Sequence, residues 1–171
     1  MFRFRTAVAV TALTITTLAP APPAGALPDW IDHTSSWTNE KAKAPRVVDL
    51  RYGAHKKFDR VVLEIDGKIP SGTARYRKRF RYDGSGEKVP IKGRSGIALV
   101  LSPAYAHDDE GGNVYEGPRI ARPRFETLKA LAFTGDFEGH VSFGLALRHR
   151  APYRVFRLHD PQRLVIDVQH R

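Results

Sequence analysis

Apolar and polar residues alternate with a period of two along several short segments of the chain. In the C-terminal segment, Leu164, Ile166 and Val168 fall on one face of a predicted strand, and polar residues alternate with them. A second apolar segment begins at Tyr153, and the Asp and Pro of residues 159–162 favour a turn between the two. The pattern predicts a C-terminal hairpin. Because an isolated hairpin is marginal in water, the rest of the chain must supply a surface for it.

Similar alternation predicts strands upstream, within residues 46–52, 58–65, 73–82 and 97–101 and in a segment that begins at Phe137. Residues 125–133 fit either a helix or a strand. We favour a strand, because Thr134-Gly135-Asp136 would then join it to the segment from Phe137 as a hairpin. About eight short strands separated by turns predict an all-β fold, a sandwich or partly open barrel of mostly antiparallel strands.

Five segments also resemble a known family. The run Pro161–Val168, Pro-Gln-Arg-Leu-Val-Ile-Asp-Val, resembles the closing strand of AMIN-type domains. Phe58–Ile65 resembles the strand that opens with Phe-Asp-Arg in the actinobacterial AMIN-like variant, and residues 83–86, 103–107 and 135–139 are similar to that variant in the same order. The resemblance covers roughly Arg46 to Arg171. It implies a small secreted β-sandwich associated with the cell envelope, without a defined ligand.

The first 26 residues are typical of a signal peptide. Arg3 and Arg5 precede a short apolar run, Thr6–Leu18, and Ala24-Gly25-Ala26 supplies small residues for cleavage. The apolar run is too short for a membrane span, which takes about 20 residues. We therefore expect residues 1–26 to be removed, 27–45 to form an N-terminal linker, and 46–171 to form one domain. The mature protein is expected outside the cell, associated with the wall and not inserted in the membrane.

Composition limits the chemistry that the protein can use. The sequence has no Cys, which excludes disulfides, thiolate catalysis and Cys-ligated zinc. It carries 28 Lys+Arg against 18 Asp+Glu, a formal net charge of +10. Such an excess favours polyanionic partners through long-range attraction. For an exported protein these are phosphate-bearing wall polymers, acidic glycans and lipid headgroups rather than nucleic acid.

The most unusual segment is 73–82, where arginine occupies every second position. Arg75, Arg77, Arg79 and Arg81 are predicted to lie on one face of a strand, roughly 6.6–6.8 Å apart. Each guanidinium can bind a phosphate or carboxylate with two parallel hydrogen bonds. The alternative is a solvated edge strand that its charges protect from aggregation. For a sugar ring, Tyr76 or Tyr105 could add a stacking surface, although such tyrosines more often anchor a loop.

No pattern in the sequence nominates a catalytic centre. Gly93-Arg94-Ser95-Gly96 does not match a nucleophile elbow, and His140 with Ser142 lacks a third group to orient the base. The acidic loop 107–113 lacks the alternate-residue spacing of an EF-hand, and no zinc-binding His pattern occurs. We expect no enzyme activity, no metal and no cofactor.

These observations predict a secreted, non-catalytic module that binds cell-wall glycan, peptidoglycan or an anionic wall polymer. The predicted ligand-binding residues are Arg75, Tyr76, Arg77, Arg79, Arg81 and Tyr105. The alternative is a protein–protein interaction module for another exported protein, which would need an exposed apolar patch around residues such as Val62. A hydrolase would need a deep cavity with converging polar groups.

Overall fold

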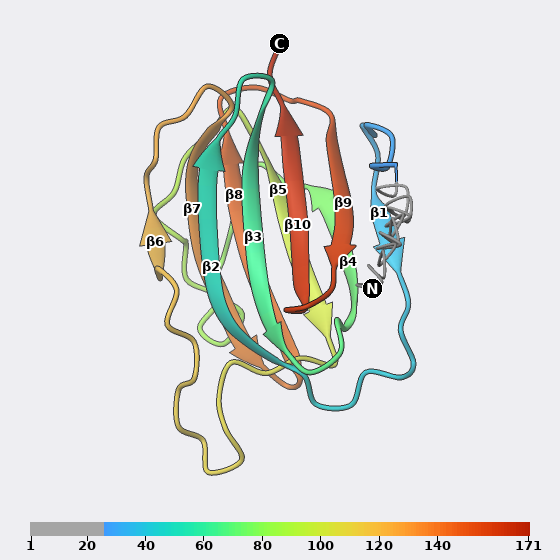
Figure 1. Cartoon of the computed structure of the whole chain (residues 1–171). Coiled ribbons are helices and arrows are strands. Elements are labelled where there is room, and N and C mark those ends of the chain that lie inside the picture. The colour runs from blue at the N-terminus through green and yellow to red at the C-terminus, as the bar shows by residue number, and fades with distance from the viewer. Residues whose placement is uncertain (1–25) are drawn as a thin grey trace, which may run out of the picture.

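The computed structural model describes residues 26–171, which form two packed antiparallel sheets (Figure 1). The six-stranded sheet has the order β1-β4-β5-β8-β7-β6, and the four-stranded sheet has the order β2-β3-β10-β9. The strands are β1 (Ser35–Trp37), β2 (Arg46–Ala54), β3 (Phe58–Asp66), β4 (Ser71–Tyr76), β5 (Ser95–Ser102), β6 (Ile120–Ala121), β7 (Leu128–Phe137), β8 (His140–Leu147), β9 (Tyr153–Leu158) and β10 (Arg163–Gln169). The all-β prediction is confirmed, and the sheets form an open sandwich rather than a closed barrel.

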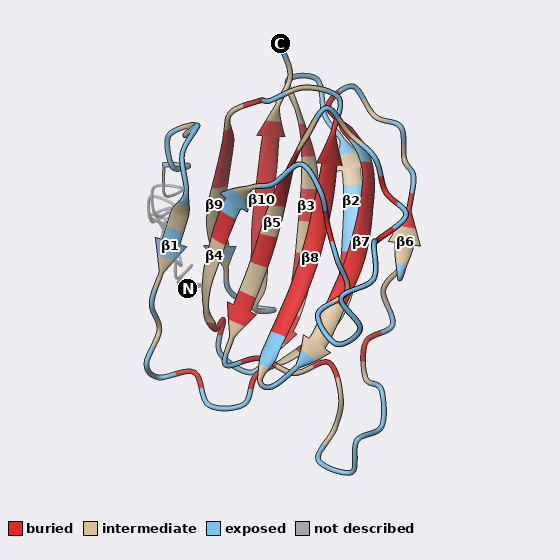
Figure 2. Ribbon diagram, turned by 180° about the vertical axis from the view of Figure 1, so that it is seen from behind, coloured by how far each residue is buried: buried red, intermediate tan, exposed pale blue. Residues whose placement is uncertain are grey.

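The core lies between the two sheets, and buried residues are concentrated on the strands (Figure 2). Burial alternates along β3 as predicted, whereas β8 is buried over nearly its whole length. Leu63 of β3, Leu99 of β5 and Ile166 of β10 are each at most 1% exposed. The C-terminal hairpin is confirmed, with β10 paired to β9 on one side and to β3 on the other. The surface that this hairpin needs is therefore the six-stranded sheet, against which its apolar face packs.

Two element boundaries differ from the sequence prediction. The predicted strand 73–82 ends at Tyr76, and the predicted turn at Thr134-Gly135-Asp136 is part of β7. The hairpin turn lies instead at Glu138 and Gly139, whose φ angles of 50° and 73° are the positive values that a tight two-residue turn requires. Gly135 marks a register shift in the ladder between β7 and β8.

The segment 27–45, expected to be a linker, runs along the open side of the sandwich between β9 and β4 (Figure 1). Ile31 exchanges two backbone hydrogen bonds with Tyr153 of β9, and β1 then pairs with β4. The Tyr153 phenol is fully buried, lies within hydrogen-bond distance of the Ala74 and His33 carbonyls, and accepts from the Ser35 N–H. The segment is thereby attached to both sheets.

A buried charge cluster joins three strands of the four-stranded sheet on its outer face. Asp167 of β10 is opposite Arg60 of β3 and Arg154 of β9 in the ladders. Its carboxylate is fully buried, accepts from Arg60 at 2.6 and 2.9 Å, and accepts from Arg154 at 2.9 Å. The Phe58 ring lies 5.0 Å from the Arg60 guanidinium, and the Trp30 ring lies 4.3 Å from that of Arg154.

The other acidic residue of the resembling motifs, Asp59, faces the opposite way. It is fully buried and accepts hydrogen bonds from the backbone N–H groups of Thr127 and Leu128 at 2.8 and 2.7 Å. Its second oxygen lies 2.9 Å from Nε2 of His170. Asp59 therefore connects β3 of one sheet to the start of β7 in the other, and both aspartates have structural roles.

We predict that Asp167→Asn lowers the free energy of unfolding by about 2–3 kcal/mol, because two guanidinium groups lose their anionic partner. The loss should be smaller than for a fully buried pair, since the Arg60 side chain is 26% exposed. Urea unfolding measures it. The control is Asp66→Asn at the exposed end of β3, and equal losses in both variants would contradict the assignment.

Candidate functional site

The outer face of the six-stranded sheet is lined by small residues. They are Gly96 and Ala98 on β5, Gly144 and Ala146 on β8, and Ala130 and Ala132 on β7. The segment 77–94, which connects β4 to β5, folds back across this face. Phe80, Val89 and Ile91 of that segment are buried against it and form a second, smaller apolar cluster.

Two glycines make this close approach feasible. A Cβ atom on Gly144 would lie 2.6 Å from Cδ1 of Phe80, and one on Gly96 would lie 2.7 Å from Cζ of the same ring. Both distances are far below van der Waals contact, so a larger residue at either position would displace the ring. The lack of a side chain at Gly96 and at Gly144 thus leaves the space that the Phe80 ring occupies.

Backbone hydrogen bonds attach the segment 77–94, which we call the crossing segment, to the sheet at Arg77 and at Asp83. The Arg77 N–H donates to the Gly96 carbonyl at 2.8 Å, and the Asp83 N–H donates to the Thr134 carbonyl at 3.0 Å. Within the segment, the Val89 N–H donates to the Phe80 carbonyl at 3.1 Å. The path of residues 77–83 across the sheet is therefore fixed at its beginning, its middle and its end.

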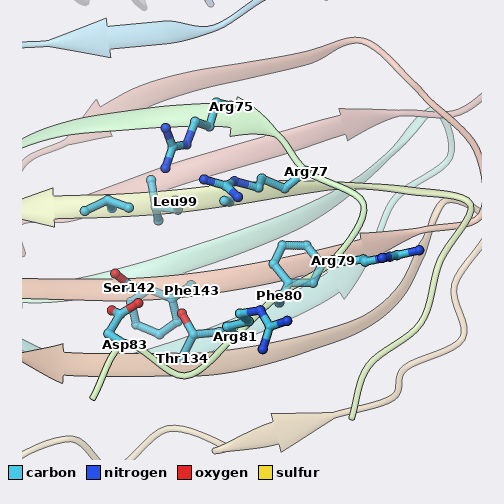
Figure 3. A pocket seen from close by; sticks show the side chains of 12 residues that line it. Arg75, Arg77, Arg79, Phe80, Arg81, Asp83, Leu99, Thr134, Ser142 and Phe143 are labelled. Atoms are coloured by element: carbon cyan, nitrogen blue, oxygen red, sulfur yellow. The ribbon is translucent and has the colours of Figure 1, made fainter. Parts of the chain in front are cut away.

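An open hollow of about 420 Å³ lies between this segment and β4. Its lining residues include the four arginines Arg75, Arg77, Arg79 and Arg81, and we call it the arginine hollow. Backbone and side-chain atoms of β5 and β8 form the floor, which includes Ala98, Val100 and Ser142. Figure 3 shows Arg75, Arg77 and Arg81 around the hollow, whereas the Arg79 side chain extends away from the other three.

Positive charge dominates the arginine hollow. In residues 26–171, none of the four guanidinium groups lies within 4.0 Å of a carboxylate oxygen. Arg81 donates to the Gly86 carbonyl at 2.7 Å, and Asp83 is the acidic residue in the lining. Four like charges around one concave surface repel one another, so an anion in the hollow would lower the electrostatic energy.

The structure corrects the predicted geometry of the arginine row. Only Arg75 lies on a strand, because the chain leaves the β4 ladder after Arg77 so that Phe80 can reach its seat on the sheet. The spacing along one strand face is therefore wrong for Arg77, Arg79 and Arg81. The crossing segment nevertheless returns these residues to one hollow, together with Thr134 and Asp83, which the local sequence pattern did not indicate.

The two predicted aromatic residues lie elsewhere. Tyr76 packs on the core side of β4, where its hydroxyl donates to the Ala151 carbonyl at 2.7 Å and the Arg150 guanidinium lies 3.6 Å from its ring centre. Tyr105 pairs with the start of β2, and its ring contacts His107 at a centroid distance of 5.3 Å. Neither residue lines the arginine hollow.

No group of three or more His, Cys, Asp or Glu side chains suited to a metal occurs within residues 26–171. Nδ1 of His140 lies 2.9 Å from the Glu138 carbonyl within the hairpin turn. His107 contacts Asp136 at 2.6 Å, but the surrounding hollow has no Ser, Thr or Cys in its lining.

Comparison with known families gives a match that spans all five motif segments. The model of the AMIN-like domain matches residues 45–170. The protein belongs to the AMIN-like domain family. No curated protein and no solved structure matches the chain.

AMIN-like domains are in general non-catalytic binding or targeting modules of the cell envelope. Membership thus assigns this protein to an envelope-associated class without naming its ligand. The predicted signal peptide lies outside the described residues, apart from Ala26. Within residues 26–171, the AMIN-like structure has no helix that is long and apolar enough to span a bilayer.

We predict that Phe80→Ala loosens the segment that carries Arg77 and Arg81. Truncating a buried Phe costs about 3–5 kcal/mol where the cavity cannot collapse. Here the loss of stability should be concentrated in residues 77–94. Amide hydrogen exchange in Phe80→Ala should therefore speed up more in that segment than in the core strands. Phe137→Ala, at a side chain that is 50% exposed, is the control. Unchanged exchange in 77–94 would contradict the anchoring role of Phe80.

We predict that stability falls as pH rises above about 10, where unfolded tyrosines ionise. Burial raises the pKa of Tyr76 to about 12, against the opposing effect of Arg150, and burial also raises the pKa values of Tyr115 and Tyr153. The folded state therefore keeps these protons while the unfolded state loses them. Urea midpoints between pH 9 and 11.5 should fall less steeply in Tyr76→Phe than in the exposed-phenol control Tyr52→Phe. Equal slopes would contradict the prediction.

Proposed function

We propose that this AMIN-like domain binds an anionic polymer of the cell envelope in the arginine hollow. The observation that carries the proposal is the gathering of Arg75, Arg77 and Arg81 around one open concavity, with no salt-bridge partner for any of them in the described part of the chain. Each guanidinium offers a planar pair of donors that fits a phosphate or carboxylate group. Several such groups around one concavity favour a ligand with repeated negative charges.

The form of the hollow supports an extended ligand rather than a small molecule. It is open to solvent, and residues of β5 and β8, among them Ala98, Val100 and Ser142, line it opposite the arginines. A polymer chain can lie across such a surface and keep several contacts at once. The buried anchor at Phe80 holds the crossing segment in place before the ligand arrives, which lowers the entropic cost of binding.

Aromatic stacking has no part in this proposal. Tyr76 is committed to the core side of β4, and Tyr105 lies outside the hollow. Affinity would therefore come mainly from charge-assisted hydrogen bonds, which ionic strength weakens. Arg79, whose side chain extends away from the other three arginines, would contribute least (Figure 3).

The alternative, a module for another exported protein, has weaker support. Val62 is half-buried and pairs with Val165, itself fully buried, and with Arg51. Within residues 26–171, the exposed large hydrophobic side chains come from three separate parts of the chain, Leu27, Tyr52 and Phe137. Tyr52 lies on β2 of the four-stranded sheet and Phe137 on β7 of the six-stranded sheet, so different sheets carry these two side chains. A protein interface would need a contiguous apolar patch.

We predict that changing Arg75, Arg77, Arg79 and Arg81 together to Gln weakens binding to purified cell walls at least tenfold. The matched control removes the same charge from exposed positions outside the hollow, Lys41, Lys43, Lys56 and Lys57. Wild-type binding should decline steeply as salt is raised, and it should decline again when phosphate-bearing polymers are extracted from the walls.

If the arginine and lysine variants lost the same affinity for cell walls, net charge alone would explain the loss. That result would contradict a specific site in the arginine hollow. Binding that is insensitive to salt would contradict the electrostatic basis of the proposal. Single replacement of Arg79 should have a smaller effect than single replacement of Arg77, which distinguishes the geometry of the hollow from a simple count of charges.

A further inference from the structure

A second hollow, of about 380 Å³, is lined entirely by basic residues. They are Arg94, Lys129, Arg148, His149 and Arg171. The residues come from the start of β5, the start of β7, the end of β8 and the C-terminal segment. We propose that this second hollow is an anion-binding site for a phosphate group, separate from the arginine hollow.

The strand ends fix two of the arginines. The Arg94 N–H donates to the Leu147 carbonyl at 2.9 Å, which places Arg94 beside the end of β8. The Arg148 side chain donates to the carbonyls of Phe125 and Arg124 at 2.9 and 3.1 Å. A guanidinium has five N–H donors, so Arg148 retains donors for a ligand while backbone oxygens hold its orientation.

The basic side chains of the second hollow have no side-chain carboxylate partner among the described residues. Within residues 26–171, Arg94, Lys129, Arg148 and Arg171 form no salt bridge. The nearby acidic residue Glu126 lies 3.2 Å from Nδ1 of His170, and its carboxylate is not part of the lining. Four permanent positive charges on one concave surface create a potential that attracts an anion.

His149 is a polar group in this site that lacks a partner. Its Nε2 atom is buried and has no hydrogen-bond partner among the described residues. Burial lowers the pKa of His149, and the positive charge of Arg171 acts in the same direction. An anion in the hollow would act on this ring through its charge and would favour the protonated form of the imidazole.

A phosphate group fits this site better than a carboxylate. A phosphate dianion presents three acceptor oxygens and two charges, whereas a carboxylate presents two oxygens and one charge. The second hollow offers donors from three guanidinium groups and one ammonium group. The same chemistry occurs in free phosphate, in a terminal phosphomonoester and, with one charge fewer, in a phosphodiester.

The two hollows share no lining residue. Ser142 of β8 belongs to the arginine hollow, and Arg148, which directly follows β8, belongs to the second hollow. Six residues along a strand span about 20 Å. The second site therefore does not rest on the function proposed for the first.

The test is an NMR titration of the full mature chain, with inorganic phosphate as the probe in a chloride buffer. Saturable shifts should appear at the His149 ring and at the Arg94 and Arg148 side-chain N–H groups, with half-saturation below about 10 mM. Parallel titrations with dimethyl phosphate and acetate separate a phosphate dianion from a diester and a carboxylate. Inorganic phosphate should bind at least threefold more tightly than either.

Variants locate the site. Arg94→Gln combined with Lys129→Gln should weaken phosphate binding at least tenfold, because both side chains are exposed and neither anchors the fold. Lys41→Gln combined with Lys43→Gln removes the same charge elsewhere and should leave binding unchanged. Replacement of all four arginines of the arginine hollow should also leave it unchanged, which separates the two proposals.

The pKa of His149 is a further readout. Saturating phosphate should raise it, because the anion offsets the positive charges of Arg94, Lys129, Arg148 and Arg171 that surround the ring, with His170 and Glu126 nearby. Absence of saturable shifts, equal affinity for acetate, or equal weakening in the Lys41/Lys43 control would overturn the proposal. A phosphate-independent pKa of His149 would also overturn it.

Discussion

The packing of Phe80 against the outer face of the six-stranded sheet determines what this AMIN-like domain presents to solvent. The face is lined by Gly and Ala, so the aromatic ring can approach the strand backbone closely. That contact bends the chain out of the β4 ladder and returns Arg81 toward Arg75 and Arg77. The arginine hollow is thus a consequence of apolar burial. Packing of the Phe80 ring on small residues of the sheet brings the arginines of the crossing segment toward Arg75.

The motifs that carry the family likeness explain the fold rather than the ligand. Asp59 joins the two sheets through backbone N–H groups at the start of β7, and Asp167 joins three strands through Arg60 and Arg154. All four residues are occupied by these internal contacts. Family membership therefore identifies the architecture, whereas the candidate binding residues lie in the segment 77–94 and at the strand ends.

The alternation of apolar residues predicted the sandwich because each strand buries one face against the core. This pattern depends only on neighbouring residues in the sequence. It predicted the C-terminal hairpin from Leu164, Ile166 and Val168 for the same reason. It extended β4 too far because Phe80 continues the alternation in sequence but packs on the opposite face of the sheet. It also could not associate Thr134 and Asp83 with the arginines, since these residues meet only after β7 and the crossing segment are in place.

The attachment of the N-terminal segment has a consequence for where the domain begins. The family match starts at residue 45, yet β1 covers the free edge of β4, and the Trp37 ring packs over Gly72 while its indole N–H donates to the Pro70 carbonyl at 2.8 Å. A fragment trimmed to the match would uncover a hydrogen-bonding strand edge and strip the Tyr153 hydroxyl of its contacts at His33 and Ser35. Such an edge invites pairing between molecules, so a fragment that starts at Pro45 would lack contacts that protect β4 and hold Tyr153 in place.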